Sequence, residues 1–260
     1  MLILIAGGRG TAGQVLTRHA RAAGHQVRVL TRAPVRDHGE VSMITGDLRD
    51  GTGLADAVSG VDAVVDLSNP AVGTRRAATR FFTAGTRQLF AAEKRAGVRH
   101  HLTLSIVGVD AMPSGYYRAK LAQERAVQDC SGATGVGHTI VRVTQFHDFA
   151  ALALQRFRLG PLVLAPPLHL RPVHLDDVAH HLLGVLESGP AEYAEELSGP
   201  RDEELLDMVR RLAAATGRRL LVEPAPLVGA VRRANQAEAL RPRAGRRGTL
   251  DFQTWLEEQS

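Results

Sequence analysis

The sequence predicts an α/β protein with a doubly wound parallel sheet and a smaller C-terminal lobe. Short apolar runs, typical of buried parallel strands, alternate with longer segments in which apolar residues recur at helical spacing. Strands and helices that alternate in this way form parallel sheets with right-handed crossovers. Because the alternation changes after about residue 145, we expect the sheet domain over residues 1–145 and the smaller lobe over 146–260, with some later segments returning to the sheet.

Six strands and three helices are expected before residue 145. The first run, LILIA at 2–6, is wholly apolar, as a strand covered on both faces should be. Helices are expected over 11–23, 74–96 and 116–130, and Gly24 and Gly97 provide stops for the first two. The other expected strands lie at 27–30, 42–45, 61–67, 101–109 and 138–143.

The pattern is less regular in the second half. FHDFAALALQRF at 146–157 predicts an apolar helix, and a proline-rich segment follows it at 160–173. A capped amphipathic helix is expected from Asp202 to Thr216, and a strand over 218–224. These shorter elements indicate a separate, smaller lobe.

The net charge of +5 does not by itself indicate a nucleic-acid partner. The basic residues are 30 Arg and two Lys spread along the chain. The segment Arg232–Arg247 is denser, with six Arg against Glu238, but it contains Pro242 and Gly245 and lacks interleaved aromatic residues. We expect this segment to be a mobile surface loop that binds no nucleic acid.

Membrane, disulfide and metal chemistry are not expected. No apolar run approaches the ~20 residues that span a bilayer, so we expect a cytoplasmic protein. Cys130 is the only cysteine, and we expect it to be structural. His174, Asp176 and Asp177 are too close together in sequence to converge on a metal, and helix capping by Asp176 explains them better.

A glycine cluster separates the first expected strand from the first expected helix. It can be aligned as Gly8-x-Gly10-x-x-Gly13 or as Gly7-x-x-Gly10-x-x-Gly13. A glycine turn in this place lets backbone N–H groups and the helix N-terminus approach a pyrophosphate. A merely structural turn is the alternative. We predict cofactor contacts from Gly7, Arg9, Gly10, Thr11, Ala12 and Gly13.

The end of the second expected strand indicates which dinucleotide binds. A protein that binds NAD usually presents Asp or Glu there to the ribose 2′-hydroxyl. Here the sequence is VLTRAPVR, with Arg32 in place of the acid and Arg36 beyond it. Together with Arg9 these guanidinium groups suit a 2′-phosphate, so we predict NADP(H) as the cofactor.

Two further segments follow strands at the edge where ligands bind in open α/β sheets. Asp47 and Leu48 follow the third strand, where a carboxylate can accept a hydrogen bond from the adenine amine, although Asp47 can also be a turn cap. Leu67, Ser68 and Asn69 follow the fourth strand. We expect these five residues to line the cofactor groove.

Tyr116 and Lys120 are the candidate catalytic pair. They lie four residues apart on an expected helix and therefore share one face. With three Tyr and two Lys in the chain, a chance pair at this offset has a probability of roughly 2%. An ammonium next to a phenol lowers the pKa of the phenol and can also reach a ribose hydroxyl. Tyr116 would then protonate a carbonyl oxygen as hydride arrives at the carbon.

Other side chains are expected around this pair. Ser105, at the end of the fifth strand, can hold the same carbonyl oxygen, with a strand-end turn as the alternative role. Phe146, His147 and Phe149 follow the sixth strand, and we expect them to line the substrate pocket.

These motifs together resemble the short-chain dehydrogenase/reductase superfamily. The matching segments are GGRGTAG, GDL, DLSNP, LSIVGVD and YYRAK, and RPVHLDDVA and ELSGPRDEELLDMV are also similar. The resemblance is to the atypical and extended NAD(P)-binding branch, which includes NmrA-like proteins and sugar-nucleotide epimerases. It implies a Rossmann-like fold in which Ser105, Tyr116 and Lys120 match the catalytic triad, and Gly7, Gly10 and Gly13 match the dinucleotide turn.

The expected function is that of an NADP(H)-dependent oxidoreductase acting on a small carbonyl or alcohol. The alternatives are an NmrA-like regulator that senses the dinucleotide without turnover, and an epimerase in which hydride leaves and returns. NmrA-like members of the first kind generally lack the Tyr-x-x-x-Lys pair, which is intact here. The sequence does not indicate the substrate, the reaction direction or the oligomeric state.

Overall fold

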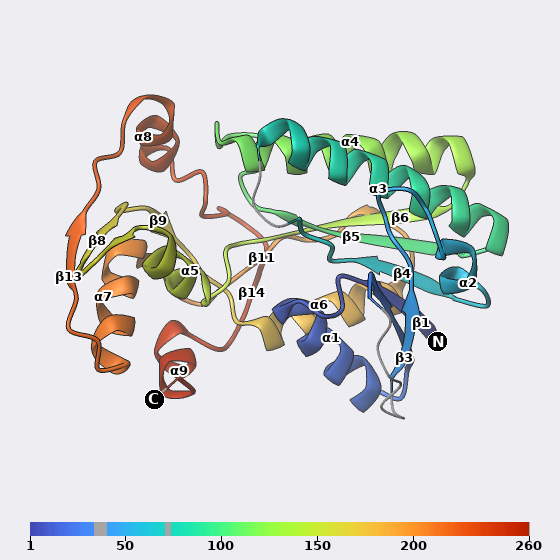
Figure 1. Ribbon diagram of the computed structural model, residues 1–260, viewed down its shortest axis with the longest axis horizontal. Coiled ribbons are helices and arrows are strands. Elements are labelled where there is room, and N and C mark those ends of the chain that lie inside the picture. The colour runs from blue at the N-terminus through green and yellow to red at the C-terminus, as the bar shows by residue number, and fades with distance from the viewer. Residues whose placement is uncertain (34–40, 71–73, 260) are drawn as a thin grey trace. The chain divides into compact units, whose positions relative to one another are not determined.

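The computed structural model describes residues 1–33, 41–70 and 74–259 (Figure 1). Its largest sheet has nine strands among these residues, and six of them come from residues 1–143. The order of these six is β6 (Gly137–Val143), β5 (His100–Ile106), β4 (Ala63–Asp66), β1 (Leu2–Ala6), β2 (Gln26–Thr31) and β3 (Ser42–Thr45). The strand order reverses between β1 and β4, which are paired directly in parallel. The doubly wound sheet expected from the sequence is confirmed, strand by strand.

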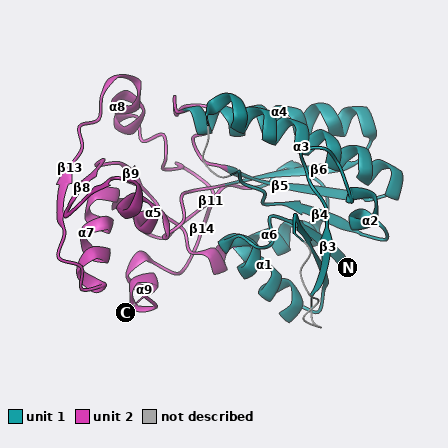
Figure 2. Ribbon diagram, viewed as in Figure 1, with its two compact units in different colours: residues 1–105, 115–142, 179–194 teal, residues 106–114, 143–178, 195–260 magenta. Residues whose placement is uncertain are grey.

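The described chain divides into two compact units (Figure 2). Unit 1 comprises residues 1–105, 115–142 and 179–194, and unit 2 comprises 106–114, 143–178 and 195–260. Compared with the expected boundary after residue 145, residues 106–114 group with the second unit. Residues 179–194, which include β10 (Glu192–Tyr193) paired with β6, return to the first.

Helices cover both faces of the sheet in unit 1 (Figure 1). On one face lie α3 (Arg75–Ala96) and α4 (Gly115–Thr134), and on the other α1 (Thr11–Ala22) and the unit 1 part of α6 (Leu175–Ser188). The rings of His19 in α1 and His180 in α6 lie 4.4 Å apart. The short helix α2 (Leu54–Val58) was not expected from the sequence, because its single turn is too short to show a helical period.

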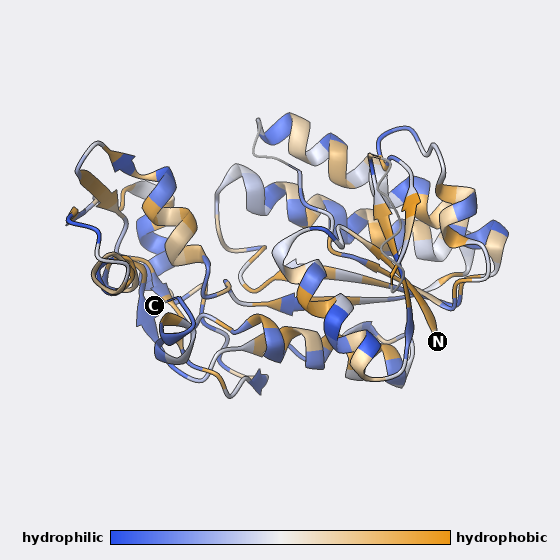
Figure 3. Cartoon of the chain, turned by 60° about the horizontal axis from the view of Figure 1, so that its bottom comes forward, coloured by the Kyte–Doolittle hydropathy of each residue, from blue (hydrophilic) through white to orange (hydrophobic). Residues whose placement is uncertain are grey.

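The apolar runs become strands because both of their faces are covered. Ile3, Leu4, Ile5 and Ala6 are all at most 1% exposed. Figure 3 shows the strands of unit 1 as largely hydrophobic and its helices as a mixture of hydrophobic and hydrophilic residues. One core cluster joins Leu4 of β1 to residues of α2 and α3, including Leu54 and Leu89.

Unit 2 contains shorter elements. Its helices are α5 (Phe149–Arg156), α7 (Leu205–Ala215), α8 (Gly229–Gln236) and α9 (Phe252–Glu257). The strand expected over 218–224 is β13 (Leu221–Pro224), which pairs with β8 (Leu162–Ala165), and β8 also pairs with β7 (Arg158–Leu159). Separately, β9 (His169–Leu170) pairs with β12 (Glu203–Glu204). β11 (Leu197–Ser198) pairs with Val143 and with β14 (Arg246–Arg247). The helices expected over 146–157 and 202–216 are both present.

The segment Arg232–Arg247 is only in part the loop that its composition predicted. Its first residues belong to α8, and its last two form β14. Asn235 is buried and its Oδ1 accepts a hydrogen bond of 2.8 Å from the His169 amide. Arg241 pairs with Asp202 at 3.0 Å. The loop prediction was therefore wrong at the two ends of the segment, whereas residues 237–245 do lie outside helices and strands.

A buried ion pair ties α3 to β5 in unit 1. His101 Nδ1 lies 2.7 Å from Glu93 Oε1, and both side chains are fully buried. His101 Nε2 also contacts Thr103 Oγ1 at 2.9 Å. Burial acts to lower the pKa of His101, but the Glu93 carboxylate, its hydrogen bond and the charge of Asp66 raise it overall. His101 is therefore held in its charged form against Glu93.

We predict that Glu93→Ala destabilises the protein by about 3–5 kcal/mol near pH 6, because it leaves the His101 charge buried without its partner. A group whose pKa is raised on folding stabilises fully below its unfolded pKa, and this stabilisation is lost as the pH rises through the folded value. The difference in unfolding free energy between the wild type and Glu93→Ala should therefore shrink as the pH rises through the raised pKa of folded His101. Urea unfolding followed by circular dichroism at several pH values measures it.

The control is Glu187→Ala, which removes a surface partner of His25. The Glu187 side chain is 58% exposed and its carboxylate lies 3.5 Å from His25 Nε2. Its loss should cost less than about 1 kcal/mol. If the two variants lost the same free energy of unfolding, the buried Glu93–His101 pair would stabilise the protein no more than the surface pair does.

Candidate cofactor and active site

The glycine turn between β1 and α1 is tightly packed against other backbone. Gly7 has a φ of +81°, and a Cβ on it would lie 2.6 Å from the Leu67 carbonyl oxygen. A Cβ on Gly13 would lie 2.5 Å from Gly8 Cα and closer still to the Gly7 carbonyl oxygen. Gly10 closes the turn through a 2.9 Å hydrogen bond from its N–H to Gly7 O. The close backbone approaches thus involve the Gly7-x-x-Gly10-x-x-Gly13 spacing.

The turn also presents the N-terminus of α1. The helix begins at Thr11, its N-cap residue is Gly10, and its first turn contains no acidic residue. Arg9, Gly10 and Thr11 are exposed, and Ala12 is half-buried. Unpaired N–H groups and the helix dipole at such an end favour an anion. The cradle that the glycines leave open fits a dinucleotide pyrophosphate.

The end of β2 carries Arg32 at an exposed position. The preceding residue, Thr31, is buried and donates a hydrogen bond of 3.1 Å to Ala33 O. Arg32 lies at the same carboxyl edge of the sheet as Arg9, because β1 and β2 are adjacent and parallel. Arg36, the third guanidinium expected here, lies outside the described residues.

Asp47 and Leu48 follow β3 but have different surroundings. Asp47 Oδ1 accepts a 2.8 Å hydrogen bond from the Arg49 amide, which is the turn-capping arrangement considered as its alternative role. Leu48 is 7% exposed and packs in the core cluster with Leu54 and Leu89. The Leu48 side chain therefore anchors the segment, so only its backbone is left for a groove.

The segment after β4 approaches the glycine turn. Leu67 donates its N–H to Ala6 O at 2.9 Å, and Ser68 donates its N–H to Asp66 Oδ1 at 2.9 Å. Leu67 and Ser68 are half-buried and Asn69 is exposed. These contacts fix the loop at the switch point between β1 and β4, where ligands bind in doubly wound sheets.

Tyr116 lies in the first turn of α4 and reaches the same loop. Its hydroxyl donates a hydrogen bond of 3.2 Å to Asn69 Oδ1, and its side chain contacts the Phe82 ring edge-on. The residue remains 39% exposed. Desolvation of the phenol raises the pKa of Tyr116, and the Asn69 hydrogen bond opposes this shift. The expected lowering of this pKa by Lys120 is not what the structure shows, because the ammonium bonds elsewhere.

Lys120 follows one helical turn later and is buried. Its Nζ donates to Leu104 O at 2.7 Å and to Gln123 Oε1, and it lies 4.7 Å from the centre of the Phe82 ring. Burial lowers the pKa of Lys120 to about 8, while the charges of Asp66 and Glu124 act to raise it. The Lys120 ammonium is thus a desolvated hydrogen-bond donor whose pKa lies closer to neutral pH than that of an exposed lysine.

Ser105 is buried at the end of β5, and its hydroxyl contacts a different group from the one expected. Its Oγ donates to Glu124 Oε1 at 2.5 Å. Arg142 donates to both oxygens of Glu124, from Nε at 3.0 Å and from Nη2 at 2.7 Å. The role of Ser105 as a carbonyl clamp stays a prediction, and it requires the hydroxyl to turn from Glu124 to the substrate.

Sequence reasoning missed the buried polar residues behind the pair. Asp66 is 2% exposed, and Gln123 and Glu124 are each 1% exposed. The sequence contains two features that could have indicated these residues. Asp66 interrupts an otherwise apolar run, and Gln123 and Glu124 follow Lys120 by three and four residues, on its face of the helix.

Of the residues expected to line the substrate pocket, Phe146 and Phe149 are half-buried and stay a prediction, whereas His147 is packed in the interior. His147 is 2% exposed, and its ring lies 5.6 Å from that of His174 and 5.7 Å from that of Phe252. Its predicted place on a pocket wall is therefore wrong. Asp176 is not the cap of α6 either: the helix begins at Leu175, and the Asp176 amide donates to His174 Nδ1 at 3.2 Å.

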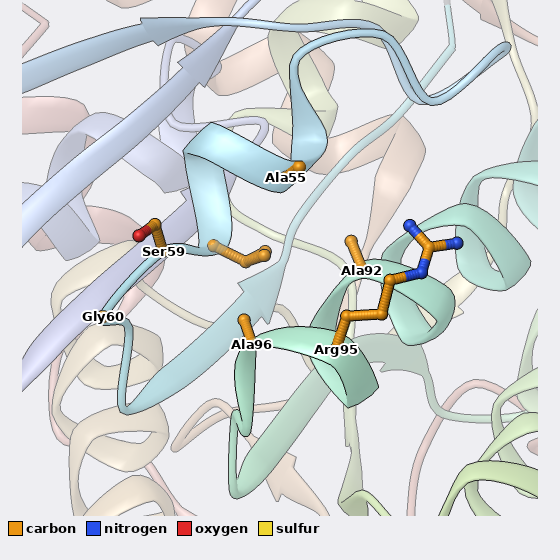
Figure 4. A pocket seen from close by; sticks show the side chains of 7 residues that line it. Ala55, Ser59, Gly60, Ala92, Arg95 and Ala96 are labelled. Carbon is orange, nitrogen blue, oxygen red and sulfur yellow. The ribbon is translucent and has the colours of Figure 1, made fainter.

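A shallow hollow of about 270 Å³ lies beside α2 and the C-terminal end of α3 (Figure 4). Its lining includes Ala55, Ser59, Ala92 and Arg95. Because α3 ends and β4 begins on this side, the hollow is at the amino edge of the sheet, away from the glycine turn. It supports no cofactor role. Within the described residues, no helix is both long and apolar enough to cross a membrane.

Comparison with known proteins identifies the family. A family model described as NAD(P)H-binding matches residues 7–188, which is more than half of the chain and starts at the glycine turn. The chain belongs to this NAD(P)H-binding family. The dinucleotide turn expected from the glycine spacing thus lies in a chain of a dinucleotide-binding family, and the NAD(P)-binding part of the expected resemblance is confirmed.

Curated relatives of this NAD(P)H-binding chain are dehydrogenases. A 3-beta-hydroxysteroid dehydrogenase from Mycolicibacterium neoaurum is 32% identical over 108 residues, which are 37% of this chain and 30% of that protein. A 3 beta-hydroxysteroid dehydrogenase/Delta 5-->4-isomerase from Mycobacterium tuberculosis strain H37Rv is 32% identical over 114 residues, 40% of this chain and 31% of the relative. The matched region therefore spans less than a third of the length of these relatives.

Solved structures share the fold of the NAD(P)H-binding chain. A short-chain dehydrogenase/reductase superfamily protein from Agrobacterium tumefaciens with bound NAD has a TM-score of 0.72 at 21% identity, over 99% of this chain and 95% of that one. UDP-N-acetylglucosamine 4-epimerase from Bacillus cereus has a TM-score of 0.72 at 17% identity, over 99% and 94%. At these identities the likeness establishes the fold.

We predict that Gly13→Ala weakens NADPH binding at least about tenfold, because a Cβ there has to push the Gly7 and Gly8 backbone out of the turn. Fluorescence titration with NADPH measures the affinity. Gly132→Ala, in α4, is the matched control: a Cβ there meets nothing within 4 Å. It should leave affinity unchanged and stabilise the helix by roughly 0.5–1 kcal/mol. Unchanged NADPH affinity in Gly13→Ala would contradict the prediction.

Proposed function

We propose that this NAD(P)H-binding protein is an NADP(H)-dependent oxidoreductase that interconverts a small carbonyl compound and its alcohol. The observation that carries the proposal is the hydrogen bond between the Tyr116 hydroxyl and Asn69 Oδ1. It brings a phenol on α4 to the loop at the switch point of the sheet. One helical turn further along α4, the buried ammonium of Lys120 supplies the second group that carbonyl chemistry needs.

The proposed cofactor contacts come from the carboxyl edge of the sheet. Backbone N–H groups of the glycine turn and of Thr11 and Ala12 hold the pyrophosphate, and Arg9 and Arg32 hold the 2′-phosphate. The backbone after β3 and β4 lines the groove through Asp47, Leu48, Leu67, Ser68 and Asn69. A bound nicotinamide supplies hydride to the substrate carbon or accepts hydride from it.

Tyr116 acts as the acid in reduction. Its raised pKa keeps the phenol protonated at neutral pH, so the hydroxyl proton is available for transfer. The carbonyl carbon gains hydride, the carbonyl oxygen takes the Tyr116 proton, and an alcohol results while Tyr116 becomes a phenolate. We propose that Lys120 holds a ribose hydroxyl and that its charge acts on this phenolate only once the nucleotide is bound. A proton from solvent then restores the phenol.

Ser105 is the third proposed participant. As the substrate carbonyl enters, its hydroxyl exchanges Glu124 for the carbonyl oxygen and stabilises the charge that develops there. The Glu124–Arg142 pair remains bonded without it. The names of the relatives suggest substrates to test, namely hydroxysteroids with their ketones and UDP-sugars. Loss of reduced-nicotinamide absorbance indicates reduction, sugar interconversion without net redox change indicates epimerisation, and tight binding without turnover indicates a sensor.

We predict that NADPH binds at least about tenfold more tightly than NADH, a difference of ~1.4 kcal/mol that one charge-assisted phosphate contact supplies. Arg32→Ala should remove most of the preference by weakening NADPH binding alone. Calorimetric titration of both nucleotides measures it. Arg95→Ala, an exposed substitution at the opposite edge of the sheet, is the control. Equal affinities of the wild type for the two nucleotides would remove the assignment of NADP(H).

We predict that Tyr116→Phe abolishes turnover and leaves NADPH affinity nearly unchanged, because the hydroxyl acts on the substrate oxygen. Lys120→Ala should damage both, because it removes the ribose contact and the phenolate stabilisation. Lys120→Arg keeps the positive charge but replaces a compact ammonium with a planar guanidinium, so it tests whether the shape of the cationic group matters as well as its charge. Steady-state kinetics and nucleotide titration measure these effects. If Tyr117→Phe inactivates and Tyr116→Phe does not, the assignment to Tyr116 is wrong.

A further inference from the structure

We infer that Asp66 and Gln123 are positioning residues that hold the Lys120 ammonium in place and keep it charged through a buried chain of hydrogen bonds. This inference rests on the proposed role of Lys120 in catalysis. It concerns two residues, one at the end of β4 and one on α4, that do not contact the reacting atoms. Their effect passes through Lys120.

Gln123 bridges a cation and an anion that do not contact each other directly. Lys120 Nζ donates to Gln123 Oε1, and Gln123 Nε2 donates to Asp66 Oδ2 at 2.9 Å. The amide can face only one way. If it were reversed, two donors would face each other at the ammonium and two acceptors at the carboxylate. All three side chains are at most 5% exposed, so water does not replace these bonds.

The other oxygen of Asp66 is bonded to the cofactor-side loop. Asp66 Oδ1 accepts from the Ser68 amide at 2.9 Å, and Asn69, the next residue, accepts from the Tyr116 hydroxyl. One carboxylate thus sets both the loop that Tyr116 contacts and, through Gln123, the position of Lys120. Among the described residues, the ammonium uses two of its three donors on Leu104 O and Gln123. The third is left for a ribose hydroxyl.

The groups that face Lys120 decide how much Asp66 matters. From α4 come Glu124 and Gln123, from α3 the Phe82 ring, from β5 the Leu104 carbonyl, and from β4 Asp66. The charge of Glu124 is offset by Arg142, which bonds both of its oxygens. Asp66 carries no such bidentate Arg partner among the described contacts, and its charge acts on Lys120 and on His101. Asp66 is therefore the main anion that keeps this desolvated lysine charged.

The experiment follows the titration of Lys120 by NMR. The chain has two lysines, so protein labelled with ¹³C-lysine gives two side-chain ε signals. Lys94 is exposed near the end of α3 and provides an internal reference in the same sample. The wild type, Gln123→Met, Asp66→Asn and the control Gln128→Met are titrated without nucleotide. Gln128 is an exposed residue of α4, so its variant makes the same substitution on the same helix.

We predict that wild-type Lys120 titrates near pH 8 and that Gln123→Met and Asp66→Asn both lower its pKa. The first change removes an acceptor from the ammonium, and the second removes the negative charge. Lys94 and the Gln128→Met variant should titrate as in the wild type. In kinetics, Gln123→Met should reduce kcat about tenfold with little change in substrate KM, and activity should fall at a lower pH than in the wild type.

Coincident Lys120 titrations in the wild type and Gln123→Met would overturn the inference. Because Met has nearly the volume of Gln, this variant decides the question even if Asp66→Asn does not fold. The NMR result is independent of turnover. A Lys120 signal that responds to Gln123 in a protein that reduces no carbonyl would uphold the positioning chain and reject the proposed function. If Tyr116 is required for carbonyl reduction but the pKa of Lys120 is the same in Gln123→Met as in the wild type, the proposed function stands and the positioning chain is rejected.

Discussion

The close approach of two backbone segments, at Gly7 and Leu67, is the constraint on which the site depends. A side chain at Gly7 would meet the Leu67 carbonyl, so the β1–α1 turn can approach the end of β4 only without one. That approach aligns the N-terminus of α1 with the loop carrying Ser68 and Asn69. Tyr116 reaches this loop from α4 through Asn69. The cofactor cradle and the candidate acid are therefore positioned by the same backbone contact.

A layer of buried charge lies between the sheet and the helix pair α3 and α4. It contains the Glu93–His101 pair, the Asp66–Gln123–Lys120 chain, and Glu124 with Arg142. Each charge has a partner, as burial in a low-dielectric interior requires. The layer places a lysine with a lowered pKa next to a tyrosine with a raised one. Environments that push pKa values apart in this way are typical of acid and base sites.

The sequence was sufficient to predict the sheet, because strands buried on both faces are continuous apolar runs that are visible without tertiary information. Tyr116 and Lys120 could be paired because helical spacing alone places them on one face. The unforeseen features depend on long-range contacts. Gln123 meets Asp66 across 57 positions, and the Ser105 hydroxyl bonds Glu124 on another element. The helix in the Arg-rich segment depends in part on burial of Asn235 against His169, which composition does not encode.

The completeness of the buried charge layer has an evolutionary consequence. Replacing one member alone leaves an isolated charge or an unpaired donor in the interior, which is strongly destabilising. Mutational drift through such intermediates is slow, whereas exposed positions of the same helices change freely. Asp66 and Gln123 should therefore co-vary across homologous chains, as should Glu124 and Arg142. These coupled positions would mark the lineages in which the lysine is held in the same way.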